Sequence, residues 1–272
     1  LAAARSGEDD LPRAQLAPLG IDDSGAVLIV WFATTGGLGD LVAQRFTAAG
    51  MAVDAAPFPI ALGFPSDWDA QATVAGLAEG WAVAWTSPTL DGDLHGIALR
   101  IVHADGSVDP ALVANTTTFS TQNDPTIARV LDEVVVAWSD NDDAIRFRRF
   151  TAAGAPLGGE VTAAPAGLGG ALPALAASAS GFLLTWTEVT MIIGDPPAVI
   201  GRRYDAGGTA LDAAGFLISD VAADGTELSG FSSAAAWRES GEYAVAFASR
   251  ANDNRGDVHA RRVPATGPVP SD

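Results

Sequence analysis

Loops rich in carboxylate and amide side chains are the part of this chain best suited to chemistry. They follow apolar runs at 91–93, 140–143 and 253–257, and the second of them reads Asp140-Asn141-Asp142-Asp143. Because Ca²⁺ prefers clustered carboxylate and carbonyl oxygens, Asp140, Asp142 and Asp143 are the candidate metal ligands, and calcium is the one cofactor considered. The sequence lacks the full calcium loop with its distal Glu. Solvated turns between strands also favour Asp and Asn, so the same residues are explained without an ion.

Two tryptophans are the candidate ligand-binding aromatics. Trp68 stands beside Pro65-Ser66-Asp67, and Trp237 stands beside Arg238-Glu239. Both lie outside the repeated pattern described below, in polar surroundings that favour exposure of the ring. An exposed indole is a good platform for a ligand.

Catalytic groups are harder to find. The three histidines, His95, His103 and His259, have no Gly-x-Ser-x-Gly turn or similar setting near them, so a Ser-His-Asp triad is not supported. A glycosidase would need only two carboxylates, and the chain has 33 acidic residues. In the segments that we expect to form the innermost strands, however, no repeat carries a carboxylate that distinguishes it from the other repeats. We therefore assign no catalytic residue and predict that the chain is not an enzyme.

The elements that carry these residues repeat five times. Each repeat holds a short apolar run that ends on an aromatic residue, and these aromatics are 54, 53, 48 and 61 residues apart. An Arg with an apolar residue after it follows, and then a Gly. The aromatics are Trp31, Trp85, Trp138, Trp186 and Phe247, and the Arg pairs are Arg45-Phe46, Arg100-Ile101, Arg149-Phe150, Arg203-Tyr204 and Arg262-Val263. Repeats of this length are typical of repeat architectures.

Each repeat predicts four short strands. The aromatic run is bounded by turn residues and rich in Val, Leu and Ile, which favours a strand. A shorter apolar segment opens 13 residues before the aromatic, at Pro18, Ala72, Pro125, Pro173 or Ala234, and Pro is tolerated at the start of a strand. The Arg segment predicts a third strand, and apolar pieces such as 59–62, 111–114 and 216–219 predict a fourth.

Four antiparallel strands repeated five times predict an all-β, five-bladed β-propeller that forms one domain over residues 1–272. The aromatics are expected to pack between blades and the repeated arginines to pair with a loop carboxylate or carbonyl. The last repeat stops soon after its third strand. We therefore expect the N-terminal segment to supply its outer strand and close the ring, or to enter a neighbouring molecule.

Composition excludes some partners. The chain has 272 residues and a formal charge of −18, and all fifteen basic residues are Arg. Nucleic acid and anionic membranes require clustered basic groups, so nucleic acid is not an expected partner. No apolar stretch approaches the ~20 residues that span a bilayer, so membrane insertion is not expected.

The third repeat also resembles a known repeat. Ala111-Leu112-Val113-Ala114-Asn115-Thr116-Thr117-Thr118, Gln122-Asn123-Asp124-Pro125, the run that ends at Trp138, and Arg148-Arg149-Phe150 with Gly154 are similar to the repeat unit of secreted and surface bacterial β-propeller proteins. That unit often accompanies calcium-binding and cadherin-like modules. The resemblance implies a propeller that is secreted or located at the cell surface, and it implies no reaction.

The function expected from the sequence is that of a non-catalytic extracellular adhesion, scaffold or assembly module that binds a protein or glycan partner. Three alternatives remain: a lectin with carbohydrate sites between blades, a carboxylate-dependent glycoside hydrolase, and a subunit that self-assembles into an extracellular fibre. A deep funnel with two carboxyl groups about 5 to 10 Å apart would favour the hydrolase.

Overall fold

The computed structural model describes residues 17–35, 38–65, 71–88, 90–167, 169–188, 197–219, 229–250 and 256–268. Within these residues every regular element is a β-strand, and none is a helix that could span a membrane. The strands are β1 Leu19–Ile21, β2 Val27–Thr35, β3 Leu38–Phe46, β4 Phe58–Pro65, β5 Thr73–Gly76, β6 Trp81–Ser87, β7 Gly96–Val102, β8 Leu112–Val113, β9 Gln122–Val130, β10 Glu133–Asp140, β11 Ile145–Thr151, β12 Val161–Ala164, β13 Gly170–Ser178, β14 Gly181–Glu188, β15 Ala198–Asp205, β16 Phe216–Leu217, β17 Ser229–Arg238, β18 Glu242–Arg250 and β19 Gly256–Pro264.

The strands form antiparallel sheets in chain order. Four sheets have four strands each, β1–β4, β5–β8, β9–β12 and β13–β16, and the fifth holds β17–β19 within the described residues. Consecutive strands are hydrogen-bonded neighbours in every sheet, as in an up-and-down meander. The four strands predicted for each repeat are therefore confirmed in the first four sheets.

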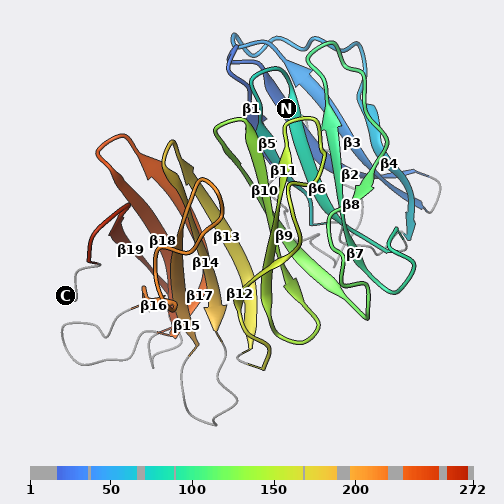
Figure 1. Cartoon of the computed structure of the whole chain (residues 1–272). Coiled ribbons are helices and arrows are strands. Elements are labelled where there is room, and N and C mark those ends of the chain that lie inside the picture. Colours follow the sequence, from blue (N-terminus) through green and yellow to red (C-terminus); the bar gives the residue numbers. More distant parts are fainter. Residues whose placement is uncertain are drawn as a thin grey trace.

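The sheets pack face to face in the order of the chain (Figure 1). The first strands of successive sheets are neighbours, because β5 lies against β1 and β9, and β13 lies against β9 and β17. Gly76 permits the closest approach. A Cβ atom there would lie 1.8 Å from the carbonyl oxygen of Ile21 in the preceding sheet, so only glycine fits.

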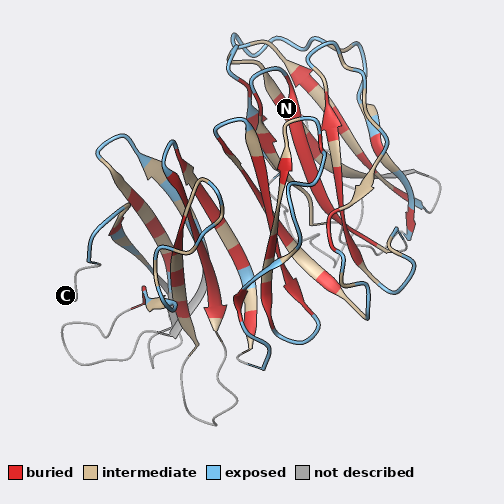
Figure 2. Ribbon diagram, in the orientation of Figure 1, coloured by how far each residue is buried: buried red, intermediate tan, exposed pale blue. Residues whose placement is uncertain are grey.

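Four apolar layers fill the spaces between successive sheets (Figure 2), and successive residues of a strand face the layers on opposite sides of its sheet. In β6, Ala82 and Ala84 face the third sheet, whereas Trp81, Val83 and Trp85 face the first. Both faces of an inner sheet are thus buried, which explains why its strands are apolar on both sides.

The aromatic residue that ends each second strand packs against the preceding sheet. Trp85, Trp138, Trp186 and Phe247 are buried, and the clusters that contain them include residues of the sheet before. Their predicted place in the core is confirmed. Trp31, in the first sheet, is only half-buried.

Arginines of the third strands connect neighbouring sheets in two directions. One set reaches back to carbonyl oxygens of the fourth strand, or its flank, in the preceding sheet: Arg100 to Ile60, Arg148 to Ala114, Arg202 to Ala163, and Arg261 to Leu217 and Ile218. A second set reaches forward to a turn of the next sheet: Arg45 to Ala104, Arg149 to Gly207, and Arg203 to Pro264 and Gly267. We call these the backward and forward arginines.

The forward arginines each pair with a carboxylate of their own sheet: Arg45 with Asp54, Arg149 with Glu133, and Arg203 with Asp212. This confirms the expected carboxylate and carbonyl partners. The sequence-based prediction that Arg100 is equivalent to these forward arginines was wrong, however. Arg100 lies opposite Val83 and belongs with the backward arginines, and the place of a forward arginine in the second sheet is taken by Ile101, opposite Ala82.

Candidate functional site

Polar side chains gather at one end of the second and third sheets, where the first strands begin and the second strands end. In Figure 1 this is the lower end of β9 and β10. We call this group the strand-start cluster; it comprises Gln71, Thr86, Asp91, His95, Asn115, Gln122, Asn123, Asp124, Ser139, Asp140 and Arg146. Its members come from the start of β9, the ends of β6 and β10, the start of β11, and the β4–β5, β6–β7 and β8–β9 connections.

Asp124 is the carboxylate of this cluster that lies on an innermost strand. It occupies the third position of β9, where the pairing register with β10 shifts between Ala137 and Ser139. The bulge places Asp124 at φ 53°, a left-handed conformation that Asp tolerates better than most residues. Such a conformation away from glycine is found often at functional sites.

Gln71 holds Asp124 from the neighbouring sheet. Its side-chain amide donates to Asp124 Oδ1 at 2.8 Å, and its Oε1 accepts the Asp124 backbone N–H at 3.0 Å. Ser139 donates its hydroxyl to Asp124 Oδ2 at 3.4 Å. Both carboxylate oxygens therefore accept hydrogen bonds, and the half-buried carboxylate is oriented at the junction of two sheets.

Asn115 and Gln122 form the buried base of the cluster. Asn115 accepts the Ile97 N–H at 2.8 Å and donates to Asp91 Oδ2 at 2.8 Å and to Gln122 Oε1 at 3.2 Å. Gln122 is fully buried and also donates to Asp140 Oδ1 at 3.4 Å. A connected buried network of this kind fixes its side chains in one arrangement, and it supports the start of β9.

Two of the three candidate calcium ligands, Asp140 and Asp142, pair with an arginine. Arg146 donates to Asp140 Oδ2 at 2.7 Å and to Asp142 Oδ2 at 2.6 Å. Burial alone would lower the pKa of Arg146, but the hydrogen bond and the charge of Asp140, with the charge of Asp142, outweigh burial and raise it. Asp143 lies in the adjacent turn at φ 61°.

Within the described ranges, no group of three or more His, Asp or Glu side chains is placed to hold a metal ion. Calcium binding by Asp140, Asp142 and Asp143 stays a prediction. The guanidinium of Arg146 already supplies the positive charge that two of these three carboxylates require.

Asp124 corrects the expectation that the innermost segments show no distinctive carboxylate. The residue 14 positions before the repeated aromatic is Ala17, Gln71, Asp124, Leu172 or Ser233. Asp124 is the acidic member of this set. The acidic residue at this one position of the repeat is the sequence signal that marks Asp124, which lies outside the acid-rich loops.

A second carboxylate lies at the same end of the fourth sheet. Glu188 is the last residue of β14 and pairs with Gly170, the first residue of the innermost strand β13. Its side chain is half-buried. Since β13 is the neighbour of β9, Glu188 and Asp124 belong to adjacent sheets at the same end.

The two candidate ligand-binding tryptophans are not brought to this cluster. Trp237 pairs with Tyr243 near the β17–β18 turn, at the opposite end of its sheet from where β17 starts. Its half-buried ring meets that of Tyr243 edge to face, with centroids 4.9 Å apart. Trp68 lies outside the described residues. Binding by either residue stays a prediction.

Comparisons with known proteins show the fold. No family model matches the sequence, and a search of curated proteins finds no match. An α-L-arabinanase of Penicillium chrysogenum, solved with arabinobiose, is 14% identical over 91% of this chain and 80% of its own, with a TM-score of 0.56. The α-L-arabinofuranosidase Arb93A of Fusarium graminearum is 12% identical over 88% and 78%, with a TM-score of 0.55.

An ulvan lyase of polysaccharide lyase family 25, bound to -[GlcA(1-4)Rha3S]-, gives a TM-score of 0.61 at 9% identity, over 89% of this chain and 67% of its own. The fold shared with the arabinanase is the β-propeller. The predicted propeller is thereby confirmed.

Two predictions about activity are wrong. The chain was expected to be a non-catalytic adhesion, scaffold or assembly module and not an enzyme, but similar structures belong to glycan-cleaving enzymes. The error has a physical origin, because the repeated strands specify the fold, whereas catalysis depends on a few residues that depart from the repeat.

Proposed function

We propose that this chain is a glycoside hydrolase that cleaves a polysaccharide, with Asp124 as one of its two working carboxylates. The observation that carries the proposal is the position of Asp124, a carboxylate on an innermost propeller strand that is held from the neighbouring sheet. The likeness of the fold to an arabinanase and an arabinofuranosidase supports it.

The proposed chemistry needs two carboxyl groups on either side of a glycosidic bond. One protonates the leaving oxygen, and the other activates water or attacks the sugar. Asp124 suits the second role, because hydrogen bonds donated by Gln71 and Ser139 hold its carboxylate in one orientation. Glu188 is our candidate for the acid, since it lies at the same end of the adjacent sheet without an arginine partner among the described ion pairs.

The proposed partner is therefore a glycan, and the proposed location is outside the cell or at its surface, where polysaccharides are met. Arabinose polymers are the first substrates to test, because two of the similar structures are named for cleaving arabinose linkages.

The test is incubation of the purified chain with linear and branched arabinan, xylan, galactan and a uronate-containing polysaccharide. Hydrolysis predicts new reducing ends without ultraviolet-absorbing unsaturated sugars. Unsaturated uronate ends would instead show eliminative cleavage, and no product from any glycan would contradict the proposal.

We further propose that the five sheets are five blades of a closed ring, with the N-terminal segment as the outer strand of the last blade. One observation supports closure: the fifth sheet has three strands within the described residues, one fewer than each of the other four sheets. Residues 1–16 themselves lie outside the described residues.

A further inference from the structure

Three equivalent positions of the repeat share an unusual backbone conformation at the end of the sheets that holds the strand-start cluster. Gln71, Asp124 and Leu172 have φ values of 39°, 53° and 52°, in the left-handed region. Each stands 14 residues before the aromatic of its repeat. In the third and fourth sheets the register with the second strand shifts at this point. We call these three residues the left-handed row.

Successive members of the row follow one another from sheet to sheet. Gln71 and Asp124 exchange two hydrogen bonds, at 2.8 and 3.0 Å. Because β13 lies against β9 as β9 lies against β5, the same step leads from Asp124 to Leu172. Leu172 is also two residues from Gly170, the strand partner of Glu188. Leu172 therefore lies on the way from one proposed carboxylate to the other.

Leu172 is the member of the row that contributes least to the fold. A leucine in the left-handed conformation is a strained outlier. Its side chain is 38% exposed, and within the described residues it belongs to none of the four apolar layers. The strained backbone is therefore not explained by burial of this side chain.

Leu172 also leaves a buried hydroxyl without a partner. In the two preceding sheets the hydroxyl that follows the repeated aromatic donates to the row, Thr86 to Gln71 at 3.3 Å and Ser139 to Asp124 at 3.4 Å. Thr187 is the equivalent residue of the fourth sheet, and its buried hydroxyl has no hydrogen-bond partner. Such a group costs stability, so a polar side chain would suit position 172 better. A residue that lowers stability in two ways is typical of a functional site.

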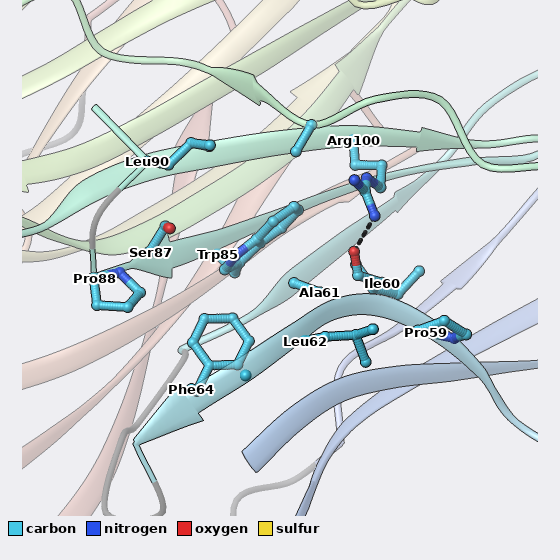
Figure 3. A pocket seen from close by; sticks show the side chains of 12 residues that line it. Pro59, Ile60, Ala61, Leu62, Phe64, Trp85, Ser87, Pro88, Leu90 and Arg100 are labelled. Atoms are coloured by element: carbon cyan, nitrogen blue, oxygen red, sulfur yellow. Dashed lines mark hydrogen bonds between the residues drawn. The ribbon is translucent and has the colours of Figure 1, made fainter. Parts of the chain in front are cut away.

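A cavity of about 380 Å³ elsewhere in the molecule is explained by packing instead. It lies between the first and second sheets and is lined by residues of β4, β6 and β7 and of the connections after β6 and β7 (Figure 3). Arg100, the charged group of its wall, donates to the carbonyl oxygen of Ile60 and so connects β7 to β4. None of the residues that line this cavity belongs to the left-handed row.

We propose that Leu172 is a substrate-binding residue, on which the apolar C–H face of a neutral sugar packs between Asp124 and Glu188. The inference rests on the proposed function, which places the bond to be cleaved between these two carboxylates. A uronate would bring a third negative charge to the same place, which is unfavourable. The substrate class is therefore a neutral glycan such as arabinan, and not a uronate polymer.

The experiment compares Leu172→Asn with Leu131→Asn. Leu131 is also left-handed, at φ 55°, and 54% exposed, but it lies in the turn after β9, at the other end of the sheet. Asparagine tolerates this conformation, so neither variant should lower the melting temperature. Leu172→Asn should raise it by about 2–4 °C, because the amide also gives Thr187 an acceptor.

Kinetics with linear arabinan, xylan and galactan separate the two variants. Leu172→Asn should raise KM about fivefold to thirtyfold with kcat changed less than about twofold, since it removes a contact made equally to substrate and transition state. Leu172→Gln, which copies the residue of the second repeat, should act in the same way. Leu131→Asn should leave both constants unchanged. Polygalacturonate should bind the unaltered chain at least about tenfold more weakly than the neutral glycan that is cleaved.

Binding is measured apart from cleavage by titrating Asp124→Asn, alone and combined with Leu172→Asn, with oligosaccharides of the same three glycans; the second substitution should weaken binding about fivefold to thirtyfold. Cleavage with an unchanged KM, a lower melting temperature for both Leu172 variants, or equal binding of polygalacturonate would overturn this proposal and leave the hydrolase standing. Weakened binding without cleavage by the unaltered chain would overturn the hydrolase alone. Neither binding nor cleavage of any of the three glycans would overturn both.

Discussion

At the scale of single residues, the aromatic that ends each second strand carries much of the packing between sheets. Trp138 is fully buried in the layer between the second and third sheets. Its Nε1 has no hydrogen-bond partner, and the same is true of Trp85 and Trp186. These indoles therefore stabilise the fold through apolar contact, and their burial outweighs the unsatisfied N–H group.

Replacement of Trp138 by Ala should lower the free energy of unfolding by about 3–5 kcal/mol, because it leaves a large cavity between two sheets. The matched variant Trp31→Ala removes the equivalent residue of the first sheet, where it is half-buried, and should cost about half as much or less. Urea denaturation measures both. Equal losses would mean that Trp31 is as well covered as Trp138.

The sequence predicted these aromatics because they recur in identical surroundings. Asp124 was missed for the opposite reason. It differs from its counterparts, and its role depends on a bulge and on a contact with Gln71, which is 53 residues away. Comparison of repeats identifies the residues that all repeats share, whereas the candidate site depends on a residue that occurs in one repeat alone.

At the scale of elements, the two sets of arginines hold neighbouring sheets together at their third strands. The sequence predicted that the arginines would pair locally, but it did not separate the backward set from the forward set. The sequence could not separate them, because the two neighbouring positions differ between repeats. They hold Arg-Arg in three repeats, Gln-Arg in the first and Arg-Ile in the second. The strand register resolves them.

The pair of Arg203 and Asp212 gives this arrangement a pH dependence. Burial by itself would raise the pKa of Asp212, but hydrogen bonds from the Arg203 side chain and backbone outweigh it and lower the pKa. A carboxyl group whose pKa is lowered by folding stabilises the fold above its unfolded pKa of about 3.9. That stability is lost as the pH falls below about 4 and through the lower folded value.

Asp212→Asn should therefore lower the free energy of unfolding by about 1–3 kcal/mol at pH 7, and the difference from the unaltered chain should shrink as the pH falls from about 4 to 2. Denaturant titrations at several pH values measure it, with the exposed Asp132→Asn as control. A difference that stays constant across this range would contradict the assignment.

At the scale of the whole molecule, the fold was more predictable than the activity. Periodicity of about fifty residues specified the strands, and apolar residues on both strand faces specified stacked sheets. The site could not be read in the same way, since its network joins residues of the β4–β5, β6–β7 and β8–β9 connections with the ends of β9 and β10. Those residues meet only when the sheets are packed.

Closure of the ring is tested by removing residues 1–16. If this segment supplies the outer strand of the last blade, the deletion should cost about 2 kcal/mol or more and lower the melting temperature by at least about 5 °C. Removal of residues 269–272 is the control at the other terminus. An unchanged melting temperature for the N-terminal deletion would mean that this segment does not close the ring.

The most direct measurement of the central claim is the rate at which the unaltered chain and Asp124→Asn release reducing ends from the same glycan. The account predicts that the unaltered chain is active and that Asp124→Asn, with an unchanged melting temperature, is slower by about 10²–10⁴-fold, as expected when a catalytic carboxylate is removed. Equal rates for the two proteins would contradict it.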